Sequence, residues 1–138
     1  MGRDEFQDGS DPASLWGIRI GVAAVFALTG AEKFASYAPY WSGVFNAIGF
    51  GEWFRYFTGG VEILGGLLFL VPRATTAGAA ILVATMLGAV GVQFVVFHRP
   101  ADALIPGAYL VGVILAFSKL HSLAFWPWPA PKSRHRKS

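Results

Sequence analysis

The sequence predicts an all-α integral membrane protein, a bundle of four membrane-spanning helices with a short interfacial helix between spans one and two. Hydrophobic residues make up 54% of the 138 residues and charged residues only 14%, whereas an ordinary soluble domain is about 25% charged. The apolar residues form four long runs, and an aromatic segment separates the first two. Lipid is therefore the solvent that suits most of this chain.

The chain divides into a polar N-terminal tail (1–14), a transmembrane domain (15–123) and a Pro-rich basic C-terminal tail (124–138). Spans are predicted at about 15–34, 53–71, 74–97 and 103–123, each near the ~20 residues that cross a bilayer. A cleaved signal peptide is the rival interpretation of the first run, but its leader is acidic where a basic segment is expected. The short connection at Pro72 predicts that spans two and three are antiparallel neighbours.

Lysine and arginine residues predict the topology. Four spans place both termini on one side, which collects Arg3, Arg19, Arg73, Lys119, Lys132, Arg134, Arg136 and Lys137. The other side has only Lys33, Arg55 and Arg99. The positive-inside rule therefore predicts a multi-pass protein of the plasma (inner) membrane with both termini in the cytoplasm. The basic tail is typical of membrane-flanking segments, and no nucleic-acid partner is expected.

The segment 35–53 is rich in aromatic residues, and we predict a short amphipathic helix in it that begins after Pro39 and ends at Gly49. Trp41 and Phe45 lie on its apolar stripe. One interpretation is an aromatic belt at the membrane boundary, which is common. The other is a lid over a site that opens toward lipid and accepts a hydrophobic molecule with a polar head.

Helical periodicity predicts which polar residues face the bundle interior. In span one, Arg19, Gly30 and Lys33 share a stripe, and in span two Gly59, Glu62 and Gly66 share another. Glycine on a membrane helix indicates close approach of a second helix.

An unpaired carboxylate near mid-membrane costs about 2.5–3.5 kcal/mol, so Glu62 should be paired or protonated. Lys33 is the first candidate partner and Arg55 the second. Gln93 and Tyr109 lie in the outer halves of spans three and four, and we predict that Lys33, Glu62, Gln93 and Tyr109 converge as a polar binding cluster. Two interpretations stay open, namely a structural ion pair and a ligand or proton site.

The sequence contains no cysteine and no recognised catalytic motif, so it leaves open whether the protein is an enzyme. No metal site is expected, because His98 and His121 fall at opposite membrane faces. Any redox role would need a bound organic cofactor or a partner.

The segments Thr29-Gly30-Ala31-Glu32-Lys33-Phe34 and Gly59-Gly60-Val61-Glu62-Ile63-Leu64-Gly65-Gly66-Leu67-Leu68 give the chain a family likeness. Their order and spacing resemble the DoxX-like family of small four-helix membrane proteins over roughly residues 15–120. The family pattern carries over to Arg19, Gly30, Lys33, Glu62 and Gly66. The resemblance implies the role of the named family members, which is that of a small subunit of a quinone-linked thiosulfate-oxidising membrane enzyme. The polar group of span three is Gln93 here, and no thiosulfate site is recognised.

Two functions follow as hypotheses. The first is an accessory subunit of a membrane redox system that contacts quinone or lipid and a soluble or membrane redox partner. The second is a non-enzymatic protein that assembles or stabilises other membrane proteins, either alone or as a homo-oligomer. A permease is disfavoured, because four helices leave little room for a transport pathway.

Overall fold

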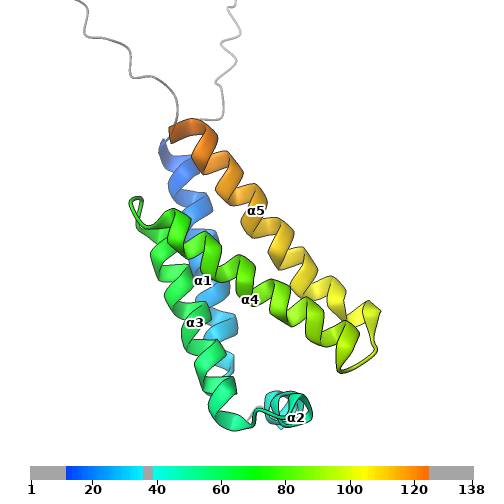
Figure 1. The fold of residues 1–138 in the computed structure, drawn as a ribbon. Helices are drawn as coiled ribbons and strands as arrows, with labels where there is room; N and C mark the ends of the chain where they lie inside the picture. The colour runs from blue at the N-terminus through cyan, green and yellow to red at the C-terminus, as the bar shows by residue number, and fades with distance from the viewer. Residues whose placement is uncertain (1–11, 36–38, 125–138) are drawn as a thin grey trace, which may run out of the picture.

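The structure, a computed structural model, describes residues 12–35 and 39–124, and these ranges contain helices without any strand. The elements are α1 (Pro12–Glu32), α2 (Pro39–Ile48), α3 (Glu52–Leu70), α4 (Thr75–Val95), the 3-10 helix η1 (Pro100–Ala103) and α5 (Leu104–Ala124) (Figure 1). The all-α prediction is confirmed. Most of each predicted tail lies outside the described residues.

Three helical segments are long and apolar enough to cross a membrane, namely Ala13–Glu32, Thr75–Val95 and Pro100–Ser122. The remaining predicted span, the second, corresponds to α3, which is 19 residues long but contains Glu52, Arg55 and Glu62. These charges lower its hydropathy, so length and composition alone do not mark α3 as a span. The number of spans stays a prediction.

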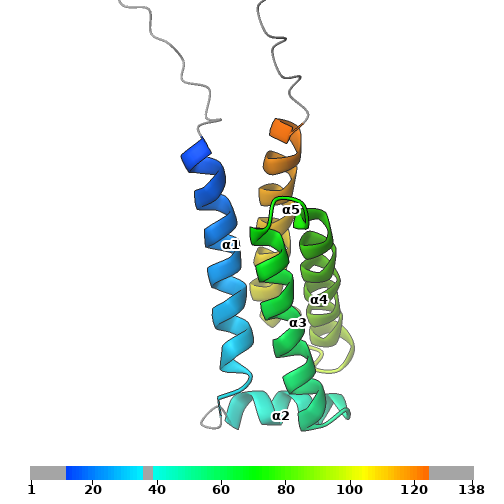
Figure 2. The ribbon, with the colours of Figure 1, turned by 90° about the vertical axis from the view of Figure 1, so that its left-hand side faces the viewer.

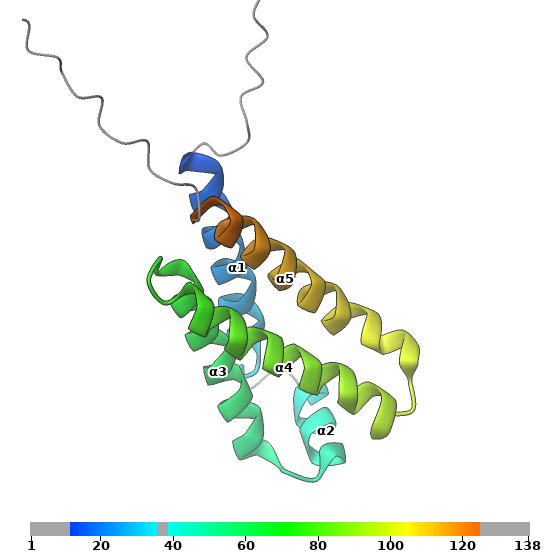
Figure 3. The same ribbon diagram turned by 45° about the horizontal axis from the view of Figure 1, so that its top comes forward.

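The helices run back and forth between two ends of the molecule. The start of α1 and the end of α5 lie together at one end, and α2 runs crosswise at the other (Figure 2). From the turn that follows α3, α4 slants away from α1 and α3, and α5 runs beside it (Figures 1 and 3). The ends of α1 and α3 nearest α2 are thus set apart from the far ends of α4 and α5.

Glycine residues let α1 and α3 approach closely. A Cβ atom added to Gly30 would lie 2.6 Å from the Gly59 carbonyl oxygen, and one added to Gly59 would lie 2.8 Å from the Gly30 carbonyl oxygen. About two turns further along α3, the Cβ position of Gly66 lies 3.2 Å from the Ala23 carbonyl oxygen. These three glycines are buried, as the predicted packing stripes require.

The apolar core is formed by residues of α1, α3, α4 and α5. Phe69 of α3 and Leu82 of α4 are fully buried, and Phe26, Ala79, Met86, Val113 and Leu120 join them from α1, α4 and α5. Gly78 of α4 sits directly against the backbone of Phe69 and Gly65. Because Gly78 has no side chain, the backbones of α3 and α4 touch at this point of the hairpin.

Arg19 holds the turn of that hairpin. Its Nη1 donates a hydrogen bond to the Phe69 carbonyl oxygen at 3.0 Å and another to the Thr75 hydroxyl. One side chain of α1 therefore bonds the last turn of α3 and the first residue of α4. The cation lies near the C-terminus of α3, where the helix dipole favours positive charge.

We expect Gly78→Ala to destabilise the protein by about 1–3 kcal/mol, because a methyl group there meets backbone atoms that cannot move independently. Thermal unfolding in mild detergent measures this. The matched control is Gly88→Ala on the same helix, where an added Cβ meets nothing within 4 Å. Equal unfolding temperatures for the two variants would contradict the close contact.

Candidate binding site at the α1–α3 contact

A buried ion pair joins α1 and α3. Lys33, directly after the end of α1, places its Nζ 2.7 Å from Oε2 of Glu62, which lies in the middle of α3. The two residues are 5% and 4% exposed. Lys33 Nζ also donates to the Thr29 carbonyl oxygen at 3.3 Å. The predicted pairing of Lys33 with Glu62 is therefore present, and each charge is compensated where neither water nor lipid could solvate it.

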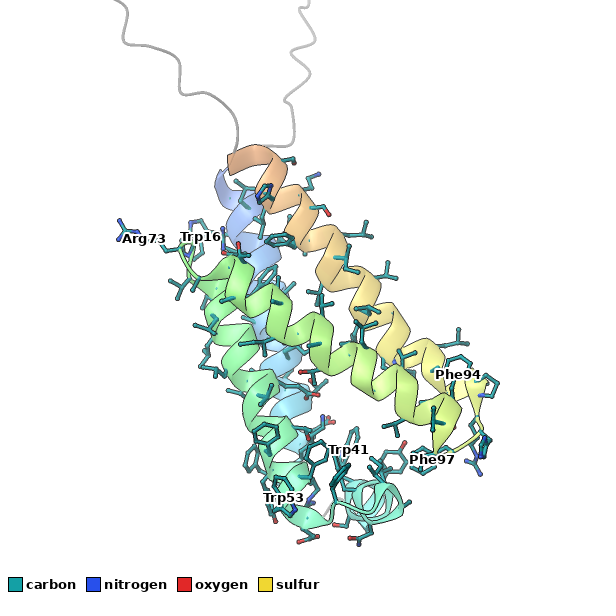
Figure 4. The ribbon with its side chains drawn as sticks, in the orientation of Figure 1. Trp16, Trp41, Trp53, Arg73, Phe94 and Phe97 are labelled. Carbon is teal, nitrogen blue, oxygen red and sulfur yellow. The ribbon has the colours of Figure 1, made fainter. Side chains whose placement is uncertain are left out.

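The short helix α2 brings an aromatic ring to this pair. The Trp41 ring centroid lies 4.4 Å from Lys33 Nζ, a cation–π contact, and the Trp41 side chain lies between α2 and the long helices in Figure 4. Phe45, one turn further on, is buried and contacts Phe54 of α3 edge to face, with ring centroids 5.9 Å apart. Both residues predicted for the lid thus face the α1–α3 pair or its surroundings.

The two remaining members of the predicted cluster have other surroundings. Tyr109 of α5 is 37% exposed, and its ring packs against Phe26 with centroids 6.0 Å apart. Gln93 is half-buried near the end of α4. Within the described ranges, no hydrogen bond or ion pair joins either of them to Lys33 or Glu62. Their participation in a binding cluster stays a prediction.

Arg55 is a buried cation whose role the sequence did not resolve. It is 3% exposed, and its Nη2 donates to the Tyr56 hydroxyl at 2.7 Å and lies 3.6 Å from Oε1 of Glu52. It is therefore not the partner of Glu62. Arg55, Gly59 and Glu62 follow the i, i+4, i+7 spacing of one helix face, so the sequence already contained the signal for its burial.

The chemistry that this site offers is hydrogen bonding and proton exchange. Lys33 can donate to a carbonyl or phosphate oxygen, and Glu62 can accept from a hydroxyl group. Trp41 adds an apolar wall beside these polar atoms. Within residues 12–35 and 39–124, no group of three or more His, Asp or Glu side chains could hold a metal ion.

Comparison with protein-family models gives a match to the model described as the DoxX-like family, over residues 18–117 of the 138. The matched region contains α2, α3 and α4 in full, most of α1 and α5, and both members of the ion pair. Comparison with curated proteins and with solved structures gives no match.

We expect Lys33→Met and Glu62→Gln each to lower the free energy of unfolding by about 3–5 kcal/mol, because each leaves a buried charge unpaired. The double variant should lose less than the sum of the two. Thermal unfolding in detergent provides the double-mutant cycle, with Glu32→Gln, at an exposed neighbouring carboxylate, as the control. Strictly additive losses would show that the pair carries no coupling energy.

Proposed function

The chain belongs to the DoxX-like family, and from this premise we propose that it is a four-span membrane protein acting as an accessory subunit of a quinone-linked redox system. The observation that carries the proposal is the buried Lys33–Glu62 pair beneath Trp41. An ion pair, a helix-packing contact and an aromatic cover suit the polar head and apolar body of a quinone or a lipid. The resemblance noted from the sequence supports quinone.

The burial of two charged residues of α3 supports this helix as a membrane span in addition to α1, α4 and α5. Arg55 and Glu62 are buried against the rest of the protein, whereas Trp53, Phe57, Leu64 and Leu67 are exposed. The surface that α3 would present to lipid is therefore more apolar than its composition suggests. Exposed Glu52 lies at the first residue of the helix, where it would reach the headgroups.

The orientation and composition of α2 support an interfacial position. It runs crosswise to the long helices at one end of the molecule (Figure 2). Exposed aromatic residues surround that end, with Tyr40 on α2, Phe50 in the following turn, and Trp53 and Phe57 on α3. Tyrosine and tryptophan are enriched at the membrane–water boundary. Such a helix would lie at the headgroups and cover the Lys33–Glu62 pair from the outer side.

In the proposed complex, Lys33, Glu62 and Trp41 would hold the quinone head. Lys33 Nζ donates a hydrogen bond to a quinone carbonyl oxygen, and the Glu62 carboxylate accepts one from the hydroxyl of the reduced form. The chain itself contributes binding, orientation and a proton acceptor. A bound quinone would supply the electron chemistry, in exchange with a soluble or membrane redox partner.

A non-enzymatic assembly role is the alternative, and one observation favours it. Large apolar side chains stay exposed along α5, namely Leu104, Ile105, Val111, Ile114 and Leu115. A second membrane protein, or a second copy of this chain, could pack there in place of lipid. Co-purification of a stable partner without any bound quinone would support this alternative.

We expect the wild-type protein, purified in mild detergent, to carry quinone detectable by solvent extraction and mass spectrometry. Trp41→Leu keeps an apolar side chain but removes the cation–π contact. The amount of bound quinone per mole of folded protein should therefore fall by about tenfold. Trp53→Leu, at an exposed tryptophan of the same end, is the matched control. Full retention in Trp41→Leu, or no quinone in the wild type, would contradict the proposed site.

The proposed topology places both termini in the cytoplasm and α2 at the outer face. The chain lacks cysteine, so Asn46→Cys, on the exposed side of α2, and Ser138→Cys each provide a single reporter. In intact cells, a membrane-impermeant maleimide should label Asn46→Cys, and it should label Ser138→Cys only after permeabilisation. The opposite pattern would reverse the topology.

A further inference from the structure

Arg55 is buried, and one of its guanidinium N–H donors has no hydrogen-bond partner among the residues that the structure describes. It is 3% exposed, and its Nε is the one buried side-chain nitrogen or oxygen without a hydrogen-bond partner in the described part of the chain. Its other contacts are the Tyr56 hydroxyl, the face of the Tyr56 ring at 4.6 Å, and Glu52 at 3.6 Å. A buried donor left unpaired is costly, more so on a charged group.

The charges near Arg55 leave an excess of positive charge. Three charged residues are buried in the described ranges, namely the cations Lys33 and Arg55 and the single carboxylate Glu62. Glu62 lies 2.7 Å from Lys33. Among the described residues, the acidic group that pairs with Arg55 is Glu52, whose side chain is 53% exposed and accepts a hydrogen bond from Ser42 at 2.8 Å. Because of that exposure, Glu52 compensates Arg55 only weakly.

The backbone beside Arg55 is also positive. Arg55 lies in the first turn of α3, and helical side chains lean toward the N-terminus, as its proximity to Glu52 confirms. The preceding Gly51, with φ 76°, provides no side-chain cap. The first amide groups of α3 therefore add the positive end of the helix dipole to the field of the guanidinium group.

We propose that Arg55 binds a phosphate oxyanion, which its Nε and one guanidinium nitrogen hold as a fork beside the first turn of α3. Guanidinium geometry matches phosphate in this way. The group is supplied by a lipid headgroup, because exposed Trp53 and Phe57 on the same turns place Arg55 at headgroup depth. Tyr56, 39% exposed over the guanidinium, is the side chain that moves to admit the ligand.

The test uses the full chain in a mild neutral detergent, freed of bound lipid by extended washing. Short-chain phosphatidylglycerol, diacylglycerol with the same chains, and inorganic phosphate are titrated separately. Thermal unfolding gives the shift, and native mass spectrometry gives the number of molecules bound. The variants are Arg55→Gln and Arg55→Lys, and the control is Arg99→Gln, which removes an exposed arginine.

In the wild type and in Arg99→Gln, phosphatidylglycerol should raise the unfolding temperature and bind with similar affinity. Arg55→Gln should bind it about tenfold more weakly or worse, and Arg55→Lys should be intermediate, because a lysine keeps the charge but loses the fork. Arg55→Lys also keeps the test valid if the glutamine variant does not fold.

The three ligands distinguish the source of the group. Arg55-dependent binding of phosphatidylglycerol alone supports a lipid headgroup, and Arg55-dependent binding of inorganic phosphate as well supports a site that free phosphate also occupies. Equal responses to diacylglycerol and phosphatidylglycerol, or unchanged binding in both Arg55 variants, would overturn the proposal. Because none of these measurements involves quinone, their failure leaves the proposed quinone site unaffected.

Discussion

The ion pair between Lys33 and Glu62 sets the condition that the α1–α3 contact has to meet. Each charge lies where lipid and protein offer little solvation, so each needs the other at hydrogen-bond distance, and the pair measures 2.7 Å. Such a distance requires the two helix backbones to be close, which Gly30 and Gly59 allow because neither has a Cβ. A helix shifted by one residue would rotate the charged group by about 100° away from its partner. The pair therefore fixes register as well as proximity.

A second polar contact holds the opposite end of the same helix pair. Arg19 lies 14 positions before Lys33, about 21 Å along the helix, and bonds the Phe69 carbonyl oxygen and the Thr75 hydroxyl. Arg19 on α1 and Lys33 just after its end thus bind α3 at two separate heights. Because Thr75 begins α4, the Arg19 contact also fixes where the α3–α4 hairpin turns. The slant of α4 starts from this point (Figure 3).

Sequence periodicity predicted which residues share one helix face, but it gives no information about contacts that depend on how helices cross. The stripes of Gly30 and Lys33 and of Gly59 and Glu62 follow from 100° per residue, which is why their pairing could be inferred. The estimated membrane depth of Tyr109 did not reveal its neighbours. Its ring packs against Phe26, and that contact depends on the direction in which α4 slants before α5 begins. The Thr75 contact of Arg19 depended on a turn whose geometry no pattern specifies.

The distribution of polar contacts separates the helices into two groups with different roles. On α4 and α5, Thr85 and Ser118 donate to carbonyl oxygens of their own helix, so neither hydroxyl binds another helix. The buried charges come from α1 and α3, and α2 supplies the ring over one of them. A hydroxyl that donates within its own helix has used its one proton and keeps only acceptor capacity, whereas an interhelical ion pair can exchange one partner for a polar head. The buried charges of the described chain are therefore concentrated around α1, α2 and α3, whereas α5 carries many exposed apolar side chains.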